Sequence, residues 1–90
     1  MDNRMMLANR SSKIIRIFAK LPFSIKILDK DFCREIKYLS NELRIYNDNW
    51  THKKSFTSQI EYEAFDPAVN DWENYLDRIE YRVNELYKLI

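Results

Sequence analysis

The last third of the chain carries an apolar residue at every third or fourth position. A repeat of this kind predicts one long helix with a continuous apolar seam. Asp66 followed by Pro67 predicts its start, because the carboxylate can accept from free amides of the first turn and proline suits a position whose N–H has no partner. We favour a core helix of its own domain over an intermolecular coiled coil. The seam consists of Val69, Trp72, Leu76, Ile79, Val83, Leu86 and Ile90.

Two further segments carry helical spacing. Apolar residues recur at spacings of four and three over 31–46, and Asn47, Asp48 and Asn49 are expected to end that helix because they accept turn conformations. Near the N-terminus, apolar and basic residues fall on opposite arcs of a helix that Ser11 or Ser12 would cap and Pro22 would close. The isoleucines of this segment also suit a buried strand paired with residues 23–28.

Residues 56–64 alternate strictly between apolar and polar side chains, which predicts a strand. A single strand leaves its N–H and C=O groups unpaired, and residues 23–28, which also alternate, are the expected partner. The alternative for that second segment is a helix running from Ser24 to Tyr46.

The predicted fold is therefore one α+β domain over 1–90, ordered helix, strand, helix, strand, long helix, with a minimal two-stranded sheet covered by helices. Residues 1–10 are expected to be a flexible end. The alternative is a mainly α three-helix bundle with one strand paired between copies.

The chain of 90 residues contains no glycine, and this excludes several kinds of site. A Walker A loop, a dinucleotide-binding turn and a nucleophile elbow each need glycine where the backbone takes positive φ or approaches a ligand closely. A chain this short has room for one modest core and no deep cofactor cleft. We therefore expect no bound cofactor.

The chain also offers few candidates for catalytic residues. Cys33 and His52 are the single thiol and the single imidazole, which is too few soft ligands for a zinc site. Cys33 lies beside the apolar stripe of its helix, where a half-buried thiol is commoner than an activated thiolate. We expect a protein that is not an enzyme and binds no metal.

Charge is divided unevenly along the chain. Residues 1–54 hold twelve Lys and Arg against six Asp and Glu, whereas residues 55–90 hold three against eight. Basic N-terminal elements can lie beside the acidic last helix, which we favour, or copies can attract head to tail. The lone cysteine and the absence of an apolar leader indicate the cytoplasm, and no run of apolar residues suits a membrane partner.

Function is expected at surfaces. The last helix should present Tyr81 outward between Asp77 and Glu85, with Tyr75 at the border of the seam, and Trp50 lies in a predicted loop where it either anchors a partner or packs on the core. We predict an inhibitor or adaptor that binds a protein of unknown identity. The AT-rich codon bias implied by abundant Ile, Lys, Asn and Tyr suits a phage or mobile element.

A nucleic-acid-associated regulator is the alternative function. It would use a basic arc on the N-terminal helix, consisting of Arg10, Lys13, Arg16 and Lys20. A homodimer is also expected, because an open strand edge, the charge asymmetry and the apolar seam each offer a contact between copies.

Overall fold

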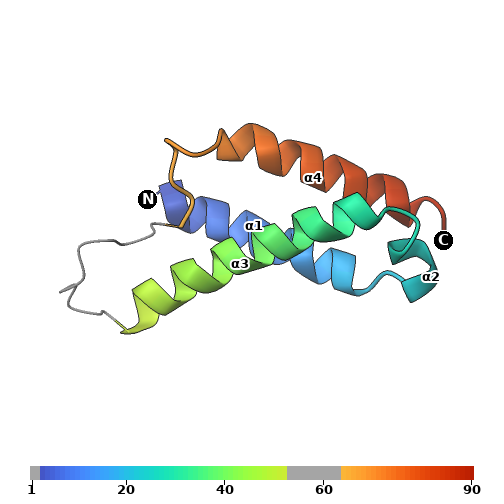
Figure 1. The fold of residues 1–90 in the computed structure, drawn as a ribbon, viewed down its shortest axis with the longest axis horizontal. Helices are drawn as coiled ribbons and strands as arrows, with labels where there is room; N and C mark the ends of the chain where they lie inside the picture. The colour runs from blue at the N-terminus through green and yellow to red at the C-terminus, as the bar shows by residue number, and fades with distance from the viewer. Residues whose placement is uncertain (1–2, 53–63) are drawn as a thin grey trace.

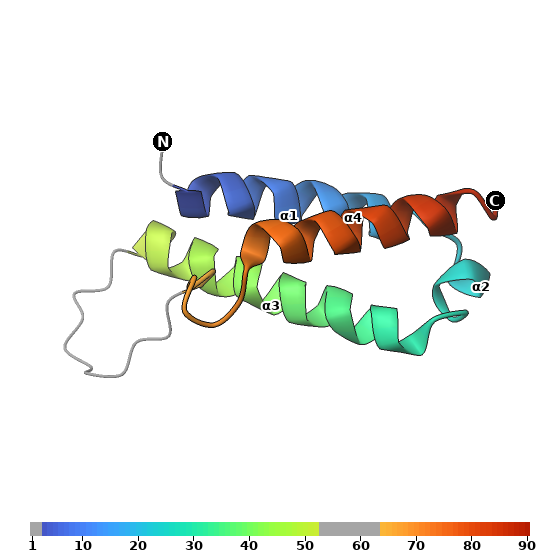
Figure 2. The same ribbon diagram turned by 90° about the horizontal axis from the view of Figure 1, so that it is seen from above.

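All regular secondary structure in the described part of the chain is helical. The computed structural model describes residues 3–52 and 64–90, and for residues 49–52 it describes the backbone alone. The helices are α1 (Asn3–Ala19), the single-turn α2 (Phe23–Lys26), α3 (Lys30–His52) and α4 (Trp72–Tyr87). The three long helices lie side by side along an elongated molecule of 47 × 22 × 20 Å, with α1 and α4 running one way and α3 the other, while α2 lies at one end (Figures 1 and 2).

The predicted two-stranded sheet is wrong. Residues 23–26 form α2, in which the Lys26 amide donates to the Pro22 carbonyl and the Ile27 amide to that of Phe23, so these groups bond locally. Alternation over only six residues does not distinguish a strand from a short helix. Pro22, whose φ is −60°, also suits the start of a helix. Most of the other predicted strand falls outside the described residues, and its last residue, Ala64, lies in a turn. The three-helix part of the alternative fold agrees with the structure.

The second helix is longer than predicted, because α3 passes through Asn47 and Asp48 and continues to His52. Asn and Asp are only mildly unfavourable inside a helix, by about 0.7 kcal/mol each. The Asp48 carboxylate also pairs with Arg44 one turn earlier at 3.4 Å. The alternative of a continuous helix from Ser24 to Tyr46 is wrong as well, since Asp29 separates α2 from α3 and its Oδ1 accepts from the Phe32 amide at the start of α3.

The first helix begins at Asn3, well before the predicted serine cap, and is a helix rather than a buried strand. Ser11 is fully buried and its Oγ donates to the Leu7 carbonyl at 2.7 Å, so it bonds within the helix instead of capping it. Leu7 and Ala8 are buried too. The N-terminal segment from residue 3 onward is therefore part of the packed bundle.

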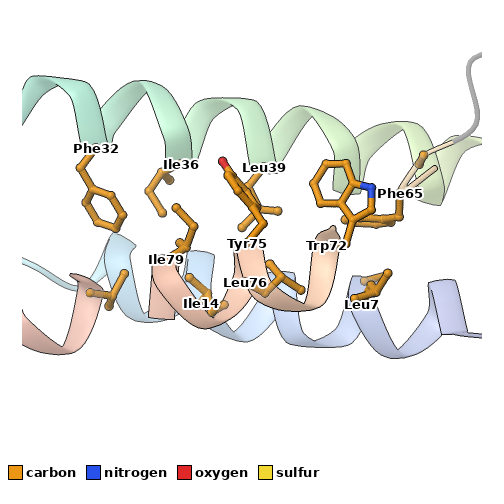
Figure 3. Packing of buried hydrophobic residues seen from close by; sticks show 13 residues of the cluster. Leu7, Ile14, Phe32, Ile36, Leu39, Phe65, Trp72, Tyr75, Leu76 and Ile79 are labelled. Carbon is orange, nitrogen blue, oxygen red and sulfur yellow. The ribbon is translucent and has the colours of Figure 1, made fainter. Parts of the chain in front are cut away.

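The apolar seam of α4 is the centre of the core. Four seam residues, Trp72, Leu76, Ile79 and Val83, are buried, whereas Val69 and Ile90 lie outside the helix and are exposed. Asp71, not Asp66, is the N-cap and accepts from the Asn74 amide. The seam packs between α1 and α3, which confirms a core helix of its own domain (Figure 3). The side chains facing it include Leu7, Ile14, Phe32, Ile36, Leu39 and Phe65.

The chain turns toward α4 at Phe65, which has a φ of 58°, an uncommon value for a residue other than glycine. Its ring is buried against Trp72 at a centroid distance of 5.2 Å. Its amide donates at 3.2 Å to the Oε1 of Glu42, a carboxylate of α3 that is almost wholly buried. A buried acceptor and a buried ring thus hold this turn where glycine is absent.

The seam supplies the first stability test. We expect Leu76→Ala to lower the free energy of unfolding by about 2–5 kcal/mol, because a fully buried leucine would leave a cavity. Val69→Ala, whose side chain is 55% exposed, is the control and should change it by less than about 0.5 kcal/mol. Urea unfolding followed by circular dichroism measures both. Equal small effects would show that α4 does not form the core.

The turn supplies a second test. Glu42→Leu removes the acceptor for the Phe65 amide, and an unpaired buried donor should cost about 1–3 kcal/mol in urea unfolding. Glu42→Gln keeps a carbonyl oxygen at that place and should retain most of the stability. A leucine variant as stable as the glutamine variant would contradict the role given to this hydrogen bond.

Candidate functional site

The outer face of α4 carries three of the predicted partner-binding residues. Tyr81 is 65% exposed, as its position on the helix predicted. The carboxylate of Asp77 accepts from Arg10 of α1 at 2.8 Å, and that of Glu85 pairs with Lys88 at 2.9 Å. Two acidic residues of this face therefore already have cationic neighbours within the molecule, which weakens the field that a basic partner would meet.

Tyr75, the fourth predicted contact residue, has its ring in the core and not at the surface. Its hydroxyl donates to the Glu35 carboxylate of α3, and its ring lies edge-on to Trp72 at 5.6 Å. Burial, with the Glu35 hydrogen bond second, raises the pKa of the Tyr75 phenol well above its usual value. Tyr75 thus joins α4 to α3.

The basic arc of α1 is divided between two roles. Lys13 and Arg16 are exposed on α1, and Lys20 is exposed just after the helix ends. Arg10 instead faces α4, where its guanidinium pairs with Asp77 and approaches Glu80 at 3.9 Å. Basic and acidic elements therefore do lie side by side within one molecule, as the charge asymmetry predicted.

Two residues remain to be placed: Trp50, the last of the predicted contact residues, and Cys33, the single thiol. The side chain of Trp50 lies outside the described part, although its backbone belongs to α3 and not to the predicted loop. The Cys33 thiol is half-buried and donates from Sγ to the Lys26 carbonyl at 3.1 Å. Within residues 3–52 and 64–90, no three His, Cys, Asp or Glu side chains could hold a metal ion, and no helix has the length and apolarity to cross a bilayer.

A surface that the sequence reading missed lies around α2. Phe23, Ile27 and Leu28 are 76%, 48% and 64% exposed. We call these three residues the apolar end, because both views place α2 at one tip of the molecule (Figures 1 and 2). Apolar side chains gathered at one exposed site mark a contact surface more often than scattered ones do.

One signal in the sequence could have indicated this surface. Pro22 and Asp29, a helix-starting proline and a capping aspartate, stand seven residues apart, which leaves room for a single turn of helix. A single turn between two long helices cannot bury side chains on every side. The apolar residues of that turn would then have been expected at the surface.

The Tyr75 phenol gives a pH-dependent test. Because its pKa is higher in the folded than in the unfolded chain, the folded state holds this proton more tightly; the stability gained is complete below about pH 10 and is lost as the pH rises further. We expect the melting temperature of the wild type to fall more steeply than that of Tyr75→Phe between pH 9 and pH 11. Tyr81→Phe, in which an exposed phenol is removed, is the control. Parallel curves for wild type and Tyr75→Phe would contradict the burial of this hydroxyl.

Comparison of the chain with protein-family models, with curated proteins and with solved structures gives no match.

Proposed function

We propose that this protein is a non-enzymatic cytoplasmic binding domain that acts as an adaptor or inhibitor of a larger protein, and that the apolar end is its contact surface. The observation that carries the proposal is the exposure of Phe23, Ile27 and Leu28 on one short, firmly anchored segment. Placing such side chains against a partner removes apolar area from water, at about 25 cal/mol for each Å².

The anchoring of this segment supports the proposal. Lys26 Nζ donates to the Ala19 carbonyl at the end of α1, and the Cys33 thiol of α3 donates to the Lys26 carbonyl. On the α3 side, Asp29 pairs with Arg82 of α4. The Lys26 side chain thus links α2 to α1, the Lys26 carbonyl links it to α3, and Asp29 links the following residues to α4, while three apolar side chains stay in solvent. A contact surface held in place before binding loses little conformational entropy when the partner arrives.

The size and charge of the apolar end and its surroundings indicate the kind of partner it would bind. The molecule measures 22 × 20 Å across, so its end offers about 400 Å², roughly half of what each side gives to a standard interface. Such a tip fits a groove in a larger protein better than a flat surface. Lys20 and Lys30 are exposed on either side of α2, so we expect an apolar groove edged with carboxylates.

We also propose self-association, but through a different contact from the strand edge and the apolar seam that the sequence suggested. Within the described residues there is no strand edge, and the α4 seam is occupied inside the molecule. We propose the apolar end as a contact for a second copy. Its small area predicts a dimer that dissociates at micromolar concentrations.

The test replaces two of the three apolar side chains. Phe23→Ser with Leu28→Ser should leave the circular dichroism spectrum unchanged, since both side chains are exposed. Wild type and double variant are used as baits in extract of the source cell, and each captured protein is then purified and titrated. We expect one protein to bind the wild type directly and to bind the variant at least tenfold more weakly, because apolar burial drives the contact.

The matched control is Val69→Ser, which removes an exposed apolar side chain that lies before α4, away from α2. It should bind as the wild type does. Equal binding by the wild type and the double variant would reject the apolar end as the contact surface. Binding of the wild type to phosphatidylglycerol vesicles, lost in the double variant, would identify a lipid surface in place of a protein and would equally overturn the proposal.

A further inference from the structure

A shallow hollow on the outer side of α3 has a donor-rich lining. Its volume is about 520 Å³, and none of the lining residues is acidic. Every one of them has a side chain with an N–H or O–H donor: Arg34, Lys37, Tyr38, Ser40, Asn41 and Arg44. Three cations and three neutral donors around one depression describe a site for an anion.

The cations are available to a ligand. Arg34 pairs with Asp31 at 3.4 Å and Arg44 with Asp48 at 3.4 Å, both within α3 and both exposed. Exposed pairs of this kind contribute little, so a phosphate can replace them at small cost. Arg44 is also oriented by Asn41, whose Oδ1 accepts from its guanidinium at 2.7 Å. The geometry therefore presents a guanidinium at one end of the hollow and a second one, Arg34, at the other.

An aromatic ring forms part of the same lining. Tyr38 is 39% exposed and stacks on Trp72 with a centroid distance of 5.9 Å and an interplanar angle of 20°. Trp72 is fixed by its indole N–H, which donates to the Asp66 carbonyl at 2.9 Å. Tyr75 meets the Tyr38 ring edge-on at 6.2 Å. The Tyr38 ring is thus held in one orientation by the core.

A second hollow of about 360 Å³ adjoins the first, because Ser40 and Arg44 line both. Its lining also includes Ile15 of α1, Leu43, Asn47 and Asp48, whose carboxylate is the partner of Arg44. The two together form a continuous depression along α3 with Arg44 at its middle. An extended chain with several phosphates fits such a shape better than a single small anion does.

We propose that this depression binds single-stranded nucleic acid, with phosphates on Arg34, Lys37 and Arg44 and a base against Tyr38. Backbone cations beside a fixed aromatic ring are the combination by which proteins hold unpaired strands, because every base has a face that can stack. A duplex keeps its bases stacked on one another and offers none to the ring. This site is separate from the apolar end, so the inference goes beyond the proposed function.

The binding test uses labelled 12-mers of dT and rU and a 12-base-pair duplex, followed by fluorescence anisotropy at 50 and 200 mM salt. We expect both single strands to bind the wild type at 50 mM salt at least tenfold more tightly than the duplex does. Lys37→Ala with Arg44→Ala should weaken binding at least tenfold and lower the slope of log affinity against log salt by about 1.4, the value for two lost phosphate contacts on a single strand. Tyr38→Leu should weaken binding about tenfold and Tyr38→Phe should not.

Two matched controls keep the result specific. Arg78→Ala with Lys88→Ala removes one cation from α4 and one from its C-cap, and should change affinity less than twofold. The Phe23→Ser, Leu28→Ser variant should bind dT as the wild type does, so failure at one site can be told from failure at the other. Three results would reject the α3 site. The first is absence of binding at 50 mM salt, and the second is an equal loss of affinity in the Lys37→Ala, Arg44→Ala and the Arg78→Ala, Lys88→Ala variants. The third is a loss of affinity confined to the triple variant Lys13→Ala, Arg16→Ala, Lys20→Ala. Equal affinity for polyglutamate would point to an acidic protein and would also overturn it.

Discussion

The packing of Trp72 against α3 is the contact on which the rest of the structure depends. The indole lies between Phe65 and Tyr38 and edge-on to Tyr75, and its N–H is satisfied by a backbone carbonyl. This arrangement sets where α4 begins and brings Leu76, Ile79 and Val83 into the space between α1 and α3. Buried rings in edge-on contact stabilise a fold by more than the burial of their apolar area alone. This aromatic cluster is therefore the contact around which the three long helices are arranged.

Absence of glycine made the turn into α4 demanding. The chain takes a positive φ at Phe65, which a residue with a Cβ does at some cost in free energy. Burial of the phenyl ring and the hydrogen bond from its amide to Glu42 offset that cost. The buried carboxylate of Glu42 thus has a structural explanation.

Part of the charge asymmetry is satisfied inside the molecule, because Arg10 of α1 meets Asp77 and Glu80 of α4. Arg82 of α4 forms a pair of the opposite sense with Asp29, just before α3. These pairs are partly exposed, so they orient the helices more than they stabilise them. What stays available to partners is different in kind: an apolar tip on α2 and a donor-lined depression on α3. Two surfaces of unlike chemistry on separate elements suit a protein that brings two partners together.

Local periodicity determined the helices and most of the core, because spacings of three and four residues specify one buried face whatever that face meets. The seam of α4 and the stripe of α3 were found in this way, as was the outward position of Tyr81. Periodicity alone could not separate a turn of helix from a short strand at 23–28, nor tell that Ser11 bonds within its helix. Only the tertiary structure decided that Tyr75 is a core residue bonded to Glu35, that Arg10 of α1 pairs with α4, and that Phe23 and Leu28 face solvent. Each of these depends on which elements become neighbours, and residues distant in the sequence carry no local signal of that.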